Sequence, residues 1–213
     1  MGFVSKLSFV KKQKEHDDIY TFFFEQKGKS YFKAGQHGLF ILPGLYKPHA
    51  YSLSSSPDEQ YVAFSTHTAT GSAHKKRLME LVEGDTVILA GPILNFTFIR
   101  RPVEYVFLAQ GIGITPFRSM LKYDHDNKLG LDITLIHVDS SEHLFKDLTK
   151  SYATKAYYPA HSDEFTAQVL QQDHNKMYYI SGKPKFVMTT KKLLKDLGVK
   201  PSDVKTDAFY EFL

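Results

Sequence analysis

The sequence predicts an N-terminal six-stranded antiparallel β-barrel followed by a C-terminal doubly wound α/β domain with a parallel sheet. Up to residue 99 the chain has short apolar runs rich in β-branched and aromatic residues, which is typical of strands joined by turns. After residue 100 strand and helix patterns alternate, as in a parallel sheet covered by helices. With 213 residues the chain is long enough for two such domains, which we place at 1–99 and 100–213.

Six runs in the first domain predict its strands: FVSKLSFVKK (3–12), IYTFFFEQ (19–26), HGLFIL (37–42), AYSLSS (50–55), YVAFSTHT (61–68) and TVILAGP (86–92). In the fourth run Tyr51 and Leu53 alternate with Ser52 and Ser54, so one face is apolar and the other carries hydroxyls. Segment 72–85 has apolar residues at helical spacing and predicts one helix that stops at Gly84.

The second domain is predicted from four strand-to-helix pairs and a closing strand. The strands are expected at 105–110, 132–138, 154–160, 177–181 and 203–212, and the helices at 115–126, 141–150, 163–172 and 183–198. No internal repeat and no low-complexity segment interrupts this order. Such an alternation favours helices on both faces of the sheet.

Composition excludes several kinds of chemistry. The chain has no cysteine, which excludes disulfides, thiolate metal sites and iron-sulfur clusters held by its own thiolates. A formal charge of +4 is too mild to indicate a nucleic-acid or membrane partner. No apolar run reaches the length of a membrane span, and the first residues lack the apolar core of a signal peptide, so we expect a cytoplasmic protein.

Six of the histidines do not predict a metal site. They share no metal-ligand spacing, and a lone histidine is more often a surface or hydrogen-bonded residue than a ligand. This group comprises His74, His125, His137, His143, His161 and His174. We therefore expect no metal ligands.

The stretch FLAQGIGITPFRSM joins the first predicted parallel strand to its helix. Gly111 and Gly113 let the backbone approach a ligand closely, Thr115 suits the N-cap, and Pro116 suits the first helical position. A helix N-terminus favours a phosphate group. The full Gly-x-Gly-x-x-Gly fingerprint is not met, so an ordinary glycine turn remains the alternative.

Four stretches together resemble a known family. HAYSLSS, GSAHKKRLMELVEGDTVILAGP, GIGITPFRSML and YYISGKPKFVMTTKKLL stand in the order and spacing of the ferredoxin-NADP reductase superfamily, specifically its short stand-alone bacterial flavin oxidoreductases. The resemblance implies a barrel that binds FAD, or FMN, and an α/β domain that binds NADH or NADPH. It also implies an FAD-dependent NAD(P)H oxidoreductase that transfers hydride to the flavin and passes electrons to an unidentified acceptor, for example a small redox protein.

Two alternatives stay open at this point. The chain could be a reductase component that feeds a ferredoxin or an oxygenase. It could also be a flavin-binding module without turnover, because several motif positions differ from the family pattern.

The resemblance assigns flavin contacts to three segments. The family motif Arg-x-Tyr-Ser falls on His49, Ala50, Tyr51 and Ser52, and it places the tyrosine against the isoalloxazine and the serine near flavin N5. The next strand offers backbone to the flavin and ribityl chain, and the helix start receives the pyrophosphate; these residues are Thr66, His67, Gly71, Ser72 and Ala73. The alternatives are that Tyr51 is plain barrel core and Ser72 is a simple N-cap.

The nicotinamide dinucleotide is assigned to the second domain. Its pyrophosphate maps to the glycine loop with Thr115 and Pro116, and Ser181 and Gly182 match a segment beside the nicotinamide ring. Ser181 and Ser52 are therefore the predicted catalytic contacts, although Ser181 could instead make a local turn bond. Asp139 follows the second parallel strand, where it could accept from a ribose hydroxyl and repel a 2'-phosphate, which favours NADH. Phe212 stands where relatives carry a late aromatic residue.

His49 is the clearest departure from the family motif. Arginine is always charged and binds phosphate with a fork of donors, whereas histidine titrates around pH 6.5. We therefore expect flavin affinity to weaken as pH rises, with Lys47 or Lys75 supplying part of the missing charge, unless His49 points away from the phosphates.

Overall fold

The computed structural model describes residues 3–26, 31–69, 71–99, 101 and 103–209. Its internal contacts divide the chain into two compact units, and the division falls between Phe98 and Ile99. The first unit holds the antiparallel strands and one α-helix, and the second holds the parallel strands and the remaining helices.

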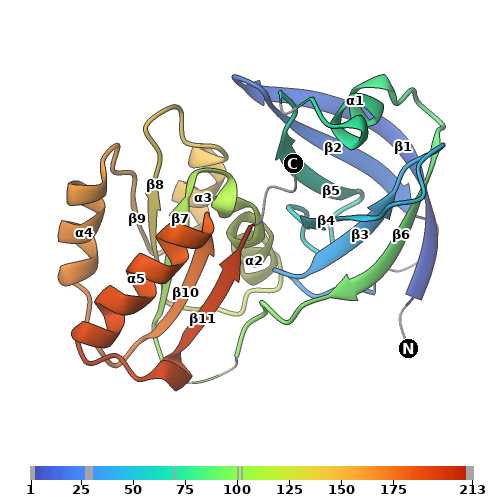
Figure 1. The fold of residues 1–213 in the computed structure, drawn as a ribbon. Helices are drawn as coiled ribbons and strands as arrows, with labels where there is room; N and C mark the ends of the chain where they lie inside the picture. Colours follow the sequence, from blue (N-terminus) through green and yellow to red (C-terminus); the bar gives the residue numbers. More distant parts are fainter. Residues whose placement is uncertain (1–2, 27–30, 70, 100, 102, 210–213) are drawn as a thin grey trace. The chain divides into compact units, whose positions relative to one another are not determined.

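The first unit is a curled antiparallel sheet (Figure 1). Its six strands run in the order β4-β3-β6-β1-β2-β5, and an isolated antiparallel bridge between Leu53 and Phe64 brings its two ends together. All six strands expected from the sequence are present: β1 (Phe3–His16), β2 (Ile19–Gln26), β3 (His37–Ile41), β4 (His49–Ser52), β5 (Val62–His67) and β6 (Thr86–Ile93). The predicted barrel is therefore confirmed as a curled, six-stranded sheet.

Aromatic side chains fill the inside of this sheet. Phe64 is fully buried, and its ring centroid lies 4.5 Å from that of Phe40, 5.5 Å from Phe22 and 5.6 Å from Phe24. Tyr51 stacks on the same ring at 4.1 Å with an interplanar angle of 8°. Aromatic rings bury large apolar areas, so Phe64 is the centre of the first unit's core.

The helix of the first unit is shorter than the sequence predicts. Helix α1 spans Ala73–Glu80, and Leu81 already has an extended ψ of 135°. Lys12 of β1 donates to the carbonyls of Met79 and Leu81, so a strand distant in sequence satisfies the last helical acceptors. Gly84, with φ of +90°, belongs to the following turn, in which the Asp85 N–H donates to the carbonyl of Val82 at 3.0 Å.

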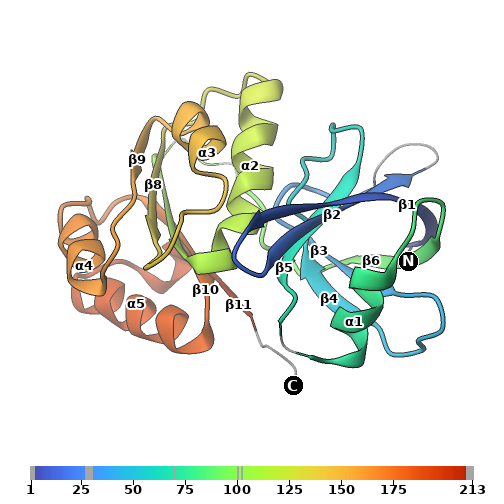
Figure 2. The same cartoon turned by 90° about the horizontal axis from the view of Figure 1, so that it is seen from above.

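The second unit is a doubly wound parallel sheet. Its five strands run in the order β11-β10-β7-β8-β9, and Figure 2 shows helices α2 and α3 on one face and α4 and α5 on the other. The strands are β7 (Tyr105–Gln110), β8 (Ile133–Val138), β9 (Lys155–Tyr157), β10 (Met177–Gly182) and β11 (Val204–Ala208). The helices are α2 (Thr115–Asp126), α3 (Lys146–Tyr152), α4 (Ser162–Leu170) and α5 (Pro184–Asp196), with 3-10 turns η1 (Gly111–Ile114) and η2 (Pro201–Asp203).

Helix α3 begins five residues later than the sequence pattern predicts, at Lys146 rather than Ser141. Asp139 Oδ1 accepts from both the backbone N–H and the hydroxyl of Ser141, at 3.0 and 2.9 Å. A carboxylate that bonds the backbone two residues on makes a turn that competes with a helix. Phe145 then takes a left-handed conformation, with φ of 59°, directly before the helix.

Strand β7 is the point at which the order of the strands in the parallel sheet reverses. The chain adds β8 and β9 on one side of β7, and then returns to add β10 and β11 on the other. In open α/β sheets, ligands bind outside the carboxyl ends of the strands at such a switch point. The loops after β7 and β10 therefore form the expected binding edge of this unit.

No helix in the part of the chain that the structure describes has the length and apolar character needed to cross a bilayer.

Replacing Phe64 with alanine should remove the centre of the aromatic core and lower the free energy of unfolding by about 3–5 kcal/mol, as expected for a buried phenylalanine. Phe23→Ala is the matched control, because Phe23 is only partly buried and meets the ring of Tyr61 edge-on at 6.3 Å. Urea unfolding followed by circular dichroism measures both. Equal losses in the two variants would contradict the central place of Phe64.

Candidate functional site

Tyr51 connects the aromatic core to a group of polar side chains. One face of its ring stacks on Phe64, while the Lys75 ammonium lies 5.2 Å from the ring centroid. Its hydroxyl hydrogen-bonds to Nδ1 of His74 at 3.0 Å, and burial raises the pKa of that hydroxyl well above its usual value, so Tyr51 stays neutral. The ring is 9% exposed, which also fits the alternative of a barrel-core residue.

Two histidines stack against each other beside Tyr51. The ring centroids of His49 and His74 are 3.8 Å apart with an interplanar angle of 28°. Burial lowers the pKa of His74 to about 3, helped by His49 and Lys75 and opposed by the Phe40 carbonyl. Burial also lowers the pKa of His49, as do the charges of Lys47 and Lys75. Both rings are therefore mostly neutral at pH 7.

The start of α1 adds Lys75 to this group of polar side chains. We call Lys47, His49, His74 and Lys75 the cationic cluster, after its two lysines. Ser72 caps the helix, since its hydroxyl accepts from the Lys75 backbone N–H at 3.3 Å, which confirms the predicted N-cap. The Lys75 ammonium donates to the hydroxyl of Thr66 on β5. Gly71 precedes the helix with φ of 69°, a conformation that favours glycine.

Other residues that the resemblance assigned to the flavin lie in different surroundings. Ala50 is exposed on β4. His67 hydrogen-bonds through Nδ1 to Oδ1 of Asp18 at 2.8 Å, and Asp18 Oδ2 accepts from the Ala69 backbone N–H at 3.0 Å. The β1–β2 turn thus holds the segment that leads from β5 to α1.

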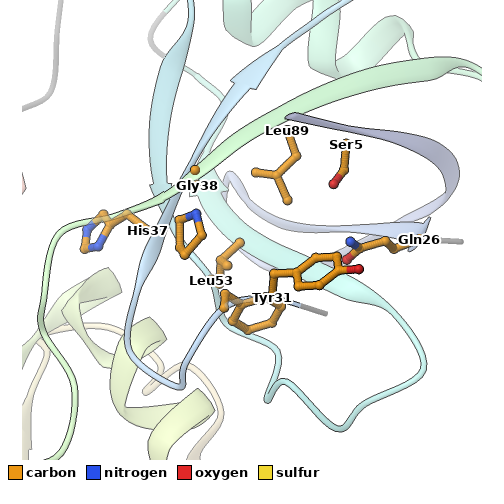
Figure 3. Close-up of a pocket in the computed structure, with 10 residues that line it drawn as sticks. Ser5, Gln26, Tyr31, His37, Gly38, Leu53 and Leu89 are labelled. Atoms are coloured by element: carbon orange, nitrogen blue, oxygen red, sulfur yellow. The ribbon is translucent and has the colours of Figure 1, made fainter. Parts of the chain in front are cut away.

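Ser52 faces away from the cationic cluster, because successive strand residues point to opposite faces. Its hydroxyl lies 2.9 Å from Nε2 of His37, whose pKa burial lowers to about 4. His37 also lines a small pocket with Gly38, Leu53 and Leu89 (Figure 3). The volume of this pocket is about 20 Å³, enough for about one water molecule and far too little for a flavin ring.

In the second unit the glycine loop packs tightly at the switch point. A Cβ on Gly113 would lie 2.3 Å from the Ser181 carbonyl oxygen, so only glycine fits against β10. Gly111 has φ of 53°, and its carbonyl accepts from Nε2 of the buried His137 at 2.9 Å. A Cβ on Gly182 would lie 2.9 Å from Phe186 Cδ1 and 3.0 Å from Gln110 Cβ. These close approaches fix the backbone around the loop.

The expectation that Thr115 caps helix α2 is wrong. The loop forms the 3-10 turn η1, which runs directly into the helix, so Ile114 takes the N-cap position. Thr115 is buried and donates from its hydroxyl to the carbonyl of Ile112 at 3.0 Å. Pro116 stands in the first turn, as predicted.

Asp139 lies at the carboxyl end of β8, close to the glycine loop. Its Oδ1 is engaged by Ser141, while its Oδ2 lies 3.7 Å from the position that a Cβ on Gly111 would take. The carboxylate therefore adds negative charge beside the loop.

Ser181 and Asp207 form a buried pair that the sequence did not reveal. Ser181 is the register partner of Asp207 on β11, and both are buried, at 0% and 5% exposure. Burial raises the pKa of Asp207 to about 7, although the neighbouring Ser181 lowers it in part. Position offered one signal, since Asp207 stands near the end of a parallel strand, but its burial depends on the folded sheet.

A larger hollow of about 490 Å³ lies at the opposite, amino-terminal edge of the parallel strands. Its lining includes Glu104, Asp132 and Lys176, which precede β7, β8 and β10. None of the residues assigned from sequence lines it.

Curated relatives match most of the chain, whereas no protein-family model matches it. The flavohemoprotein of Bacillus subtilis (strain 168) is 25% identical over 231 residues, which cover 94% of this chain and 58% of that protein. The toluate 1,2-dioxygenase electron transfer component of Pseudomonas putida is 27% identical over 201 residues, which cover 84% of this chain and 59% of that protein. The chain thus spans less than two thirds of the length of these relatives.

Solved structures identify the fold. The flavohem-like FAD/NAD-binding domain of nitric oxide dioxygenase from Vibrio cholerae matches with a TM-score of 0.74 and 20% identity, covering 96% of this chain and 98% of that chain. Ferredoxin-NADP+ reductase from Plasmodium falciparum matches with a TM-score of 0.76 and 17% identity, covering 97% and 96%. The chain has the ferredoxin-NADP reductase fold. The resemblance that the sequence motifs indicated is therefore confirmed by relatives and by structure.

The ferredoxin-NADP reductase fold gathers the assigned residues into two groups. In the first unit Lys75 interacts with His49, Tyr51, Thr66 and Ser72, whereas Ser52 and His67 have other partners. In the second unit the glycine loop, Asp139 and Ser181 lie at the carboxyl edge. Sequence reasoning missed His74 and Asp207, and Phe212 lies outside the described residues.

The raised pKa of Asp207 predicts a pH-dependent stability. The Asp207 carboxyl titrates near pH 7 in the folded protein and near 3.8 in the unfolded chain. Below pH 3.8 it is protonated in both states and does not lower the free energy of unfolding. Between pH 3.8 and pH 7 it ionises more readily in the unfolded chain, so the free energy of unfolding falls as pH rises. Relative to Asp207→Asn, the wild-type free energy of unfolding should therefore fall by about 4 kcal/mol between pH 4 and pH 8.

Urea unfolding at several pH values measures this difference. Asp132→Asn, at an exposed position before β8, is the control and should follow the wild type. A constant difference between wild type and Asp207→Asn across this range would contradict the raised pKa.

Proposed function

We propose that this chain is an FAD-dependent NAD(P)H oxidoreductase whose first unit binds FAD and whose second unit binds the nicotinamide dinucleotide. The observation that carries the proposal is the pairing of a cationic cluster at the start of α1 with a glycine loop at the switch point of a parallel sheet. Each is a phosphate-binding arrangement. Relatives named as electron transfer components and FAD/NAD-binding domains support it.

The donor set of the first unit fits the diphosphate of a flavin. Lys47 and Lys75 are the two lysines that act on His49, His49 adds a titratable donor, and the N-terminal backbone of α1 lies in the same region. Amides at a helix N-terminus and ammonium groups both favour phosphate. A second phosphate seat favours FAD over FMN.

In the second unit the backbone performs most of the binding. Gly113 packs against the Ser181 carbonyl, and a loop with glycine at positions 111 and 113 would let a ligand pyrophosphate approach the backbone at η1. His137 bonds the Gly111 carbonyl and so helps to hold the loop in place. Ser181 and Asp207 then lie at the ends of the two strands beyond the loop, where a buried hydroxyl and a carboxyl with a pKa of about 7 could contact a nicotinamide ring.

Bound FAD would supply the redox chemistry, taking two electrons from the nicotinamide and releasing them to an acceptor. The protein's part is to bind and orient the two cofactors and to exclude competing reactions. No side chain needs to act as an acid or base in the transfer between them. Ser52, engaged with the neutral His37, would be a hydrogen-bonding residue.

A redox protein is the acceptor that the relatives favour. The toluate 1,2-dioxygenase electron transfer component serves a dioxygenase by name, and the glycine betaine monooxygenase reductase subunit of Pseudomonas aeruginosa, 32% identical over 60% of this chain, serves a monooxygenase. We propose that this chain likewise reduces a partner protein of an oxygenase system. An acceptor screen with ferricyanide, cytochrome c and ferredoxins tests the breadth of that transfer.

Anaerobic mixing with NADH tests the enzyme proposal directly. The purified protein, reconstituted with FAD, should lose its visible flavin absorbance within the mixing experiment and recover it when an acceptor is added. Persistent colour with both NADH and NADPH would favour a flavin-binding module without turnover. Failure to retain any flavin would contradict the proposal itself.

Asp139 should select NADH over NADPH, because its carboxylate repels a 2'-phosphate. Asp139→Ser removes the charge and should raise kcat/KM for NADPH by about tenfold, which corresponds to about 1.4 kcal/mol, with a smaller change for NADH. Glu142→Gln, which also removes an exposed negative charge from this loop, is the matched control. A wild-type preference for NADPH would overturn the assignment.

A further inference from the structure

We propose that the stacked pair of His49 and His74 couples flavin binding to proton uptake: the pair is neutral in the flavin-free protein and takes up a single proton, on His49, when the flavin diphosphate binds. This inference rests on the proposed function and specifies how its flavin site is controlled. The observations are the ring stack, the two neighbouring lysines and the unequal burial of the two histidines.

In the flavin-free protein both histidine rings are neutral. His74 is 3% exposed, and its Nδ1 is already bonded to the Tyr51 hydroxyl. Its pKa is lowered to about 3, first by burial. His49 is partly exposed, and burial, Lys47 and Lys75 lower its pKa as well. In the absence of an anion, the protein therefore disfavours a charge on either ring.

The two stacked rings cannot both be charged. With centroids 3.8 Å apart, two imidazolium rings would repel each other strongly, so the pair can hold only one positive charge. His49 is the ring that can carry it, because it is partly exposed whereas His74 is buried. His74 stays neutral and holds both the His49 ring and the Tyr51 hydroxyl in place.

A bound anion changes the pKa of His49. The groups that face the pair are Lys47 from the loop before β4, Lys75 from α1 and the neutral Tyr51 hydroxyl from β4. A diphosphate bound between these cations offsets their charge, so the pKa of His49 rises on binding. A group whose pKa is higher in the bound state strengthens binding at low pH, and that strengthening is lost as pH rises through the bound-state pKa.

Titration calorimetry measures the coupling. FAD is added to the apoprotein at pH 7 in phosphate-free buffers with different ionisation enthalpies, and the slope of the observed enthalpy gives the number of protons taken up. We expect uptake of up to a single proton, and an FAD affinity that falls by about three- to tenfold from pH 6 to pH 8.

Two variants and a control sharpen the result. His49→Gln cannot titrate and His49→Arg is always charged, so both should show no uptake and a flat pH dependence, with FAD bound more tightly by the arginine variant. His161→Gln, at an exposed histidine before α4, should take up the same proton fraction as wild type.

A direct readout does not depend on the variants. Nuclear magnetic resonance of the His49 Cε1–H signal, titrated with and without FAD in the wild-type protein, should give a higher pKa in the bound form. Binding of FAD without proton uptake, or uptake that persists in His49→Gln, would overturn the inference while leaving the flavoprotein assignment intact. Absence of FAD binding at every pH would instead contradict the proposed function.

Discussion

The stack of Tyr51 on Phe64 is the contact on which the first unit depends. Phe64 belongs to the buried aromatic core, and the stack, at 4.1 Å and 8°, fixes the plane of the Tyr51 ring. The Tyr51 hydroxyl then fixes His74, His74 supports His49, and Lys75 covers the other side of the tyrosine ring. Barrel packing therefore helps to position the cationic groups, so the residues that stabilise the core also support the proposed flavin site.

The second unit obtains its rigidity from the backbone. Gly113 lies against the Ser181 carbonyl, and the buried His137 bonds the Gly111 carbonyl. Glycine at two of the four loop positions leaves backbone amides open to a ligand, and neighbouring strands hold the loop in place. Asp207 differs from these backbone contacts, because it is a buried carboxyl with a pKa of about 7. Its charge therefore changes within the physiological pH range.

Periodicity predicted the strands and helices because burial on one face leaves a local record in the sequence. All six antiparallel strands and the alternation of strands and helices after β7 followed from it. Helix ends were less predictable. Helix α1 stops where Lys12 reaches the carbonyls of Met79 and Leu81, and α3 starts late because Asp139 bonds Ser141, and neither contact appears in a hydrophobic pattern.

The candidate site shows the same division between local and long-range information. The motif resemblance found His49, Tyr51 and Ser72 because each stands in a recognisable local segment. It did not find that His49 and His74 stack, because they lie on different elements, or that His37 engages Ser52. Such contacts depend on the closed sheet.

The central claim is that the first unit recognises the phosphates of a flavin through the cationic cluster. Equilibrium titration of the apoprotein with FAD and with riboflavin, which has the same ring and no phosphate, tests it most directly. The account predicts that FAD binds at least about a hundredfold more tightly, as expected when charge-assisted hydrogen bonds to phosphate are lost. Equal affinities for FAD and riboflavin would contradict it.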